Sequence, residues 1–494
     1  AQRGDLPGAE TALRQGLTQL DTWLVESSAT PQGKREFLSR SQWFFDLLMD
    51  VLARQGRGAE AMEVGQHIQM QTDRASLDLT RVDGRTPEVT RTLRDLESKR
   101  EEAEALRSQV QAAESAGDVQ TAEKLKQRLA GNTREFHQTL ATLRQQDPEL
   151  ERLVAVRPSS FSKLQPHLPE GTLLVGYYPG PDKLFVFTAT RKDLKIYGVN
   201  VGRKALERDV TAVRRAIINS ARNSQPLDAQ SQALLASLYD SLLGPLEGDL
   251  SGIDTVAVVP SGMLYYLPFA ALTRNGRYLV EQRAVVLLSS LEVLELVQGK
   301  QTGKPDNLLA LANPDGSLPG AAAEVQKLAP LFARSQIFYT RDATKQRIQK
   351  PGAASVVHLA THGVLDARDV NQSYLVMAGS EKLTTGEIYG LDLSQVSLVT
   401  LSACQTGLGE RQPGAEVANL AQAFSVAGSK SMLASLWKVD DEATAELMVH
   451  FYRELMAGKN KAEALRQAQL KLIADPRRNH PFQWASFELI GDWR

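Results

Sequence analysis

Two residues stand where a cysteine nucleophile and its base would be expected. His362 follows an apolar, β-branched run ending at residue 360, and Cys404 follows a similar run ending at residue 402. Neighbouring parallel strands end at the same sheet edge, so the two side chains would emerge together. A nearby imidazole raises the thiolate fraction of a thiol or takes its proton. The pattern therefore predicts a Cys–His pair, with backbone N–H groups of Gly363 and Cys404 as oxyanion donors.

The same residues have plainer interpretations. A lone cysteine is most often a small buried hydrophobe. His358 and His362 are four residues apart, as in a zinc-protease helix, but the segment has strand composition and lacks the glutamate of His-Glu-x-x-His. In a strand this spacing spans about 13 Å. We therefore expect His358 to be a packed strand residue. The signatures of serine α/β-hydrolases and P-loop NTPases are also absent from the sequence.

Composition narrows the class of protein. The 494 residues carry 57 Lys+Arg and 58 Asp+Glu, a net charge of −1, so direct nucleic-acid binding is not expected, although a local basic patch stays open. No apolar run approaches the roughly 18 residues of a membrane-spanning helix. The single cysteine excludes an intramolecular disulfide and predicts a reducing, cytoplasmic location. The chain opens without an initiator methionine or a signal peptide, and we expect further residues upstream.

The first 150 residues have the composition of helices. Residues 1–87 show apolar positions spaced by three and four, with a turn at 53–58 typical of tetratricopeptide-like (TPR-like) hairpins, and a plain helical bundle is the alternative. Residues 88–150 carry two runs of apolar residues seven apart, joined by Gly117-Asp118. This pattern predicts an antiparallel coiled-coil hairpin ending at Asp147-Pro148.

The rest of the chain has the pattern of an α/β fold. A β-hairpin is predicted over 172–188, helical structure over 203–243 and a helix from 291 to 297. Short apolar strands then alternate with amphipathic helices, which indicates a mainly parallel sheet flanked by helices. The expected strands are 255–260, 284–289, 307–312, 335–339, 355–360, 397–402 and 431–436, and the expected helices are 321–332, 415–427, 441–457 and 460–474.

Several motifs give residues 151–494 a resemblance to a known family. The chain resembles CHAT-family proteins, caspase-like cysteine proteases related to caspases and separases and often attached to tetratricopeptide repeats. The matching stretches, in order, are Val259-Pro-Ser-Gly-Met-Leu-Tyr-Tyr-Leu-Pro-Phe269, Leu318-Pro-Gly320 with Glu324, His358-Leu-Ala-Thr-His-Gly363, Leu401-Ser-Ala-Cys-Gln-Thr-Gly407, Ala434-Ser-Leu-Trp-Lys-Val-Asp440 and Trp484-Ala-Ser-Phe-Glu-Leu-Ile-Gly-Asp-Trp493.

The resemblance implies a fold and a chemistry. It implies a caspase-like fold with a degenerate pseudo-caspase subdomain at 151–300 and a catalytic subdomain at 301–494. It makes Cys404 the nucleophile and His362 the acid/base of an acyl-enzyme mechanism that needs no metal or cofactor. Gln405 stands where the family often has Glu, which should change local charge only, and Ser261 stands in the non-catalytic half where the family often has His.

Substrate specificity rests on residues near the end of the 431–436 strand. In caspases an extended substrate adds to such a strand, so Trp437 would wall a subsite. Asp440 and Asp441 have two interpretations: they cap the following helix, or they line the S1 pocket and favour a basic P1 residue. Asp366 and Asp369, after the histidine, are rival acidic candidates.

The sequence leaves the biological role open between classes. The resemblance implies a protease that cleaves a protein substrate, such as a gasdermin-type protein in bacterial defence or cell death. The N-terminal helices would bind a regulatory protein partner and restrain the active site. The alternative is a non-catalytic caspase-like scaffold, which intact Cys404 and His362 disfavour, and a transferase or peptide ligase would use the same acyl-enzyme.

Overall fold

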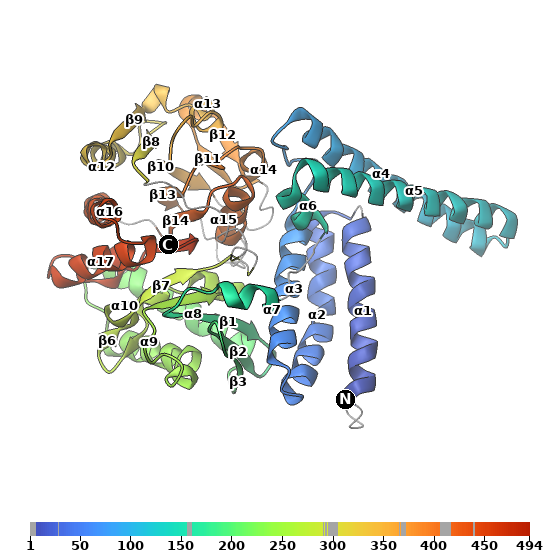
Figure 1. The fold of residues 1–494 in the computed structure, drawn as a ribbon, viewed down its shortest axis with the longest axis horizontal. Coiled ribbons are helices and arrows are strands. Elements are labelled where there is room, and N and C mark those ends of the chain that lie inside the picture. Colours follow the sequence, from blue (N-terminus) through green and yellow to red (C-terminus); the bar gives the residue numbers. More distant parts are fainter. Residues whose placement is uncertain are drawn as a thin grey trace.

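The computed structural model describes residues 6–27, 29–155, 161–289, 291, 294, 305–364, 366, 372–405, 416–437 and 440–494. Figure 1 shows an α/β body flanked on one side by helices, from which a long helical hairpin extends. Among the described helices, none has the length and hydropathy that crossing a membrane requires.

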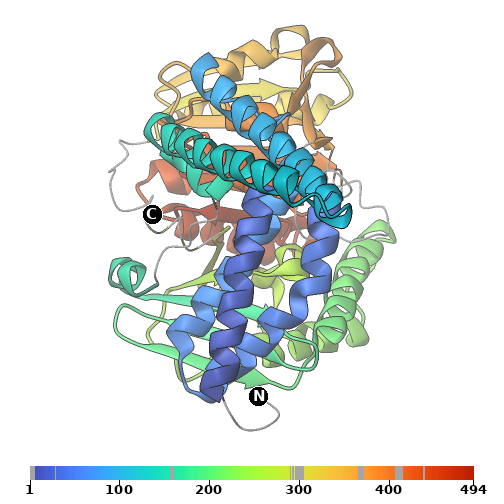
Figure 2. The same cartoon turned by 90° about the vertical axis from the view of Figure 1, so that its right-hand side faces the viewer.

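Three helices open the chain and lie side by side (Figure 2). They are α1 (Leu6–Glu26), α2 (Pro31–Arg54) and α3 (Gly58–Ser76). Thr30 caps α2 by accepting a hydrogen bond from the Gly33 N–H, and a proline follows at the first helical position. Gly56 adopts a φ of 70° in the turn between α2 and α3, at the place the sequence predicts.

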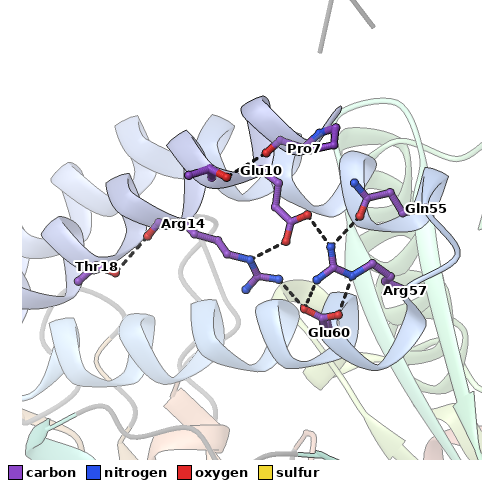
Figure 3. Close-up of polar contacts among 8 residues, drawn as sticks. Pro7, Glu10, Arg14, Thr18, Gln55, Arg57 and Glu60 are labelled. Atoms are coloured by element: carbon purple, nitrogen blue, oxygen red, sulfur yellow. Dashed lines mark hydrogen bonds and ion pairs between the residues drawn. The ribbon is translucent and has the colours of Figure 1, made fainter. Parts of the chain in front are cut away.

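An ion-pair network fastens α1 to this turn (Figure 3). Arg57 in the turn and Arg14 on α1 each contact both Glu10 of α1 and Glu60 of α3. The hydrogen bond from Arg14, followed by the contacts with Arg57, lowers the pKa of Glu10 even though burial acts to raise it. The network links α1 to the turn after α2 and to the first residues of α3.

The predicted helical hairpin is present. It consists of α4 (Pro87–Ser115) and α5 (Val119–Gln146), packed along their length. Asp118 caps α5 through the Thr121 N–H, so the Gly-Asp pair makes the turn. The apolar residues that the sequence places seven apart are mostly buried, whereas Val110 and Leu129 are only partly buried. The buried ones are Val89, Leu96, Ala103, Ala122, Phe136 and Leu143. The short helices α6 (Pro148–Ala155) and α7 (Phe161–Leu164) lead into the sheet.

One continuous sheet runs through the α/β body. We call strands β1 to β7, with the helices between them, the first half, and strands β8 to β15, with the helices between them, the second half. The first half contains β1 (Thr172–Pro179), β2 (Leu184–Ala189), β3 (Leu194–Val199), β4 (Thr255–Val259) and β7 (Ala284–Leu287), plus the small separate hairpin β5 (Thr273–Arg274) and β6 (Arg277–Tyr278). The second half contains β8 (Asn307–Ala312), β9 (Arg334–Tyr339), β10 (Val356–Val364), β11 (Tyr374–Val376), β12 (Lys382–Thr384), β13 (Leu398–Gln405), β14 (Ser431–Ser435) and β15 (Phe487–Gly491).

The strand order confirms the predicted mainly parallel core. The main path is β12-β11-β10-β13-β14-β15-β7-β4-β1-β2-β3, and β8 lies beside β10 with β9 beyond it. The pairs that join β8, β9, β10, β13 and β14 are parallel. Antiparallel strands were not predicted in the second half, where β11, β12 and β15 supply them. The two halves meet through β15 and β7, which share the single residue pair Ile490–Leu287.

Helices flank the sheet in both halves. Figure 1 shows α12, α16 and α17 on one side of the second-half strands and α14 and α15 on the other. The predicted helical stretch 203–243 is two helices, because Asp228 caps a new one. Most of the predicted helix 291–297 lies outside the described residues. The bounds are α8 (Arg203–Arg222), α9 (Ala229–Leu242), α10 (Leu279–Gln282), α12 (Pro319–Leu328), α13 (Lys345–Gln349), α14 (Thr385–Tyr389), α15 (Glu416–Val426), α16 (Asp441–Met456), α17 (Lys461–Ala474) and α18 (Pro481–Trp484).

Candidate active site

The strands that carry the predicted histidine and cysteine are parallel neighbours. In the β10–β13 ladder Ala360 pairs with Ser402 and Gly363 with Cys404, so Thr361 and His362 together oppose one residue. Such a bulge re-aims a side chain, and bulges are frequent beside active sites. The backbones of Gly363 and Cys404 therefore lie side by side at the carboxyl edge of the sheet. The side chain of Cys404 is outside the described part of the chain.

A loop after a third strand holds the His362 imidazole. Ser317, in the β8–α12 loop, lies with its Oγ 2.7 Å from Nε2 of His362. The same hydroxyl donates to Oδ1 of Asp315 at 2.8 Å. Since its one proton is committed to Asp315, the hydroxyl accepts from His362, which places the imidazole proton on Nε2. Nδ1 of His362 is then an unprotonated base, buried and without a hydrogen-bond partner among the described residues.

Asp315 is suited to anchor this arrangement as a carboxylate. Burial acts to raise its pKa, but hydrogen bonds from the backbone and hydroxyl of Ser317, together with the nearby His362, lower the pKa below its ordinary value. Its Oδ2 lies 3.9 Å from Nε2 of His362. Through Ser317, this carboxylate holds the imidazole in place.

A buried polar network lies beneath the edge of the sheet. Ser402 donates to Oε2 of Glu324 at 2.9 Å, and Oε1 of that carboxylate lies 3.0 Å from Nε2 of His358, outside good hydrogen-bond geometry. On its other side His358 is 3.2 Å from the Tyr452 hydroxyl, which is 2.7 Å from Oγ1 of Thr400. The network ties α12 and α16 to the strands of His362 and Cys404. His358 is fully buried, which confirms it as a packed strand residue.

Two predicted pocket residues, Asp440 and Asp441, stand at the start of α16 and have different surroundings. Asp440 is the N-cap of α16 and accepts hydrogen bonds from the Glu442 and Ala443 N–H groups at 3.1 Å. Its carboxylate also lies 3.7 Å from the Arg478 guanidinium, which pairs with Glu442 at 2.6 Å. Asp440 therefore has the predicted capping contacts, which partly compensate its charge.

Asp441 differs from Asp440 in its surroundings. It is exposed, and its carboxylate packs so closely on Gly320 that a Cβ at that position would overlap it. Gly320 lies in the first turn of α12, three residues after Ser317. Asp441 therefore lies on the side of α16 that faces the loop holding His362.

The other predicted pocket residues have mixed surroundings. Trp437 is 3% exposed and donates its indole N–H to the Phe482 carbonyl at 2.9 Å, so its side chain is inside the protein. Asp366 is partly buried, and its N–H donates to the Ser373 hydroxyl. Asp369 lies outside the described residues.

Sequence reasoning missed Asp315 and Ser317. Both stand in the turn Asn313-Pro-Asp-Gly-Ser317, directly after a predicted strand. Polar residues past the carboxyl end of a strand next to the histidine strand were the available signal. The order of strands in the sheet was needed to use it, because β8 is separated from β10 by α12 and β9 along the chain.

Comparison with known proteins finds a matching family and two relatives. A model of the CHAT domain family matches residues 232–492, from within α9 almost to the end of the chain. Tetratricopeptide repeat protein 28 of Mus musculus is 27% identical over 52% of this chain, and the Homo sapiens protein of that name is 26% identical over the same share. The chain spans only 13% of the length of either relative.

A solved structure supports the fold. In a Saccharomyces cerevisiae separase–securin complex, the matched chain aligns with a TM-score of 0.50 at 9% sequence identity, over 98% of this chain and 40% of that chain. At this identity the likeness concerns the fold alone. The expected caspase-like fold, with a mainly parallel sheet, flanking helices and an N-terminal helical region, is confirmed.

Proposed function

This chain belongs to the CHAT domain family, and on that premise we propose that it is a cysteine endopeptidase, with Cys404 as nucleophile and His362 as acid/base. One observation carries the proposal. Parallel pairing brings the backbones of Gly363 and Cys404 together beside a histidine whose Nε2 is already occupied and whose Nδ1 is left as a base.

In the proposed reaction, Nδ1 of His362 takes the proton of the Cys404 thiol. The thiolate attacks the scissile carbonyl carbon, and the N–H groups of Gly363 and Cys404 stabilise the oxyanion. His362 then returns the proton to the leaving amine, and water hydrolyses the acyl-enzyme. Asp315 and Ser317 hold the Nε2–H side of the ring throughout, so that Nδ1 is the atom that gains and loses the proton. These steps use no metal or cofactor.

We propose that the substrate is an extended protein segment that adds beside the end of β14, with a basic P1 residue. Asp441 is the better S1 candidate of the two predicted acids, because Asp440 is engaged by the α16 N–H groups and lies near Arg478. Trp437 would contribute to a subsite through its backbone, since its side chain is buried. A gasdermin-type protein is one substrate to test.

We further propose that the helices regulate this site. Gln66 of α3 accepts a hydrogen bond from the Leu291 N–H. Asp46 of α2 accepts hydrogen bonds from the Tyr178 hydroxyl and from Arg203, both in the first half. The segment between α3 and α4 reaches the second half, where the Asp83 N–H donates to the Gly386 carbonyl at 3.1 Å and Arg85 donates to the Val426 carbonyl.

That second contact surface involves two helices of the second half. Val426 ends α15, the helix that follows Cys404 in the chain, and Gly386 lies in α14. A protein partner that moves the helical region would act through this segment. We propose the functional division 1–87, 88–150, 151–300 and 301–494, and action in the cytoplasm.

The test is cleavage of a proteome-derived peptide library by the wild type and by Cys404→Ala. We expect the wild type to cleave after basic residues and the variant not to cleave. Because the chain has one cysteine, a thiol-reactive probe reports on Cys404 alone. Equal cleavage by both proteins contradicts the proposal. Absent cleavage together with an unreactive Cys404 favours a non-catalytic scaffold.

A further inference from the structure

Arg214 lies on α8 in the first half, but its guanidinium reaches the second half. Nη2 donates to the Leu436 carbonyl at 3.1 Å, and Nη1 lies 3.5 Å from the carbonyl of Tyr266. The guanidinium also lies over the rings of Tyr266 and Trp437, with its central carbon 5.0 and 5.8 Å from the ring centroids. One side chain thus connects the backbones of the two halves.

Arg214 keeps its charge in this buried place. It is 6% exposed, and burial lowers its pKa to about 10, so it stays protonated at neutral pH. Glu488 on β15 is the nearby carboxyl, and its own pKa is raised well above the ordinary value by burial. A buried cation is costly unless its donors are satisfied, and here carbonyl oxygens and aromatic faces compensate it.

The Leu436 carbonyl, which accepts the hydrogen bond from Arg214, lies directly after the end of β14. Leu436 directly follows β14, which pairs in parallel with β13, the strand of Cys404. The Leu436 N–H donates a hydrogen bond to the Ser486 carbonyl at 2.7 Å. The indole N–H of the next residue, Trp437, donates to the Phe482 carbonyl. The end of β14 is therefore fixed from both sides before the chain reaches the N-cap of α16.

We propose that Arg214 is a positioning residue through which the first half fixes the substrate-binding edge at the end of β14. The inference rests on the proposed peptidase function. It assigns to the first half, which lacks the proposed catalytic pair, a role in binding the substrate. Arg214 touches neither His362 nor Ser317 in its described contacts, so it acts on substrate binding and leaves the catalytic pair unchanged. Lysine cannot replace it, because a single ammonium does not present the planar fork that reaches two carbonyls.

The experiment compares Arg214→Lys and Arg214→Gln with Arg215→Lys, a matched control at an exposed neighbouring position on the same helix. KM and kcat are measured on the best library peptide, and Cys404 is alkylated with iodoacetamide, which needs no substrate edge. Melting temperatures verify that each variant is folded. Loss of a charged hydrogen bond predicts a rise in KM of about tenfold to a hundredfold, with unchanged kcat and alkylation rate. Arg215→Lys should match the wild type.

Three outcomes overturn the inference. A folded Arg214→Lys with the wild-type KM removes it and leaves the peptidase intact. An alkylation rate that falls as far as cleavage does would mean general damage to the site, and also removes it. If Cys404→Ala cleaves the library as well as the wild type does, both the proposed function and this inference are wrong.

Discussion

The two halves of the sheet have similar cores of buried parallel strands but different residues where those strands end. In the first half β4 runs into Pro260-Ser261-Gly262, followed by the buried rings of Tyr265 and Tyr266. In the second half β10 and β13 run into the His362 and Cys404 positions. Buried aromatic rings therefore follow a strand end of the first half, whereas the residues that we propose to be catalytic follow two strand ends of the second half.

This difference shows that the fold alone does not determine the chemistry at the sheet edge. Parallel strands supply a sheet edge in both halves, and the side chains past that edge decide what the edge does. The proposed roles follow this division: the second half carries the catalytic pair, and the first half supplies support through Arg214.

The largest loss of activity should come from removing the proposed catalytic side chains at the ends of β10 and β13. Cys404→Ala should abolish peptide cleavage, and His362→Ala should reduce kcat/KM by about 10²–10⁴-fold, the usual contribution of a general base. Ser261→Ala, at the equivalent edge of the first half, should leave kcat/KM unchanged. A loss of activity in Ser261→Ala would break the comparison, because the first half would then take part in the chemistry.

Next in size is the buried network under the second-half edge. Glu324→Ala leaves the hydroxyl of Ser402 without its acceptor and His358 without its carboxylate, which should lower the free energy of unfolding by about 3 kcal/mol. Glu324→Gln keeps an acceptor for Ser402 and should lose less. Urea unfolding measures both, and equal losses in the two variants would show that the hydrogen bond is not the source of the stability.

A smaller effect is expected at the loop that holds the histidine. Ser317→Ala removes the acceptor for Nε2, so both imidazole tautomers become available and kcat/KM should fall about tenfold, close to 1.4 kcal/mol. Ser317→Thr keeps the hydroxyl and should restore activity. If Ser317→Ala retains wild-type kcat/KM, the proposed tautomer control is wrong.

The smallest effect concerns Glu488, where the two halves meet. Its folded-state pKa is raised by burial, against the opposing influence of Arg214, so the unfolded chain releases the proton first. Glu488 therefore subtracts stability as the pH rises from about 4.5, the ordinary glutamate value, towards its folded pKa. The melting temperature of Glu488→Gln should equal that of the wild type near pH 4 and exceed it by a few degrees at neutral pH. Parallel curves over this range would contradict the assignment.

Sequence patterns were sufficient for the second-half core. Buried parallel strands are continuous apolar runs, so β8, β10, β13 and β14 could be located within a few residues, and His362 and Cys404 after β10 and β13 marked the edge. The capping contacts of Asp440 were also predictable, because an aspartate before an amphipathic helix has a local cause.

Long-range contacts could not be predicted in this way. Ser317 meets His362 across 45 residues, and Arg214 meets Leu436 across 222. The bulge at Thr361–His362 depends on register with β13, which no local pattern specifies. These contacts appear only when strand order and helix placement are known.

The most direct test of the proposed catalytic pair is the pH dependence of Cys404 alkylation by iodoacetamide, in the wild type and in His362→Ala. Cys404 is the single cysteine, so each adduct in the mass spectrum reports that thiol. A Cys404–His362 pair predicts a wild-type profile whose apparent pKa lies below about 8.5, the ordinary thiol value, and a return to that value in His362→Ala. Identical profiles in the two proteins would contradict a Cys404–His362 pair.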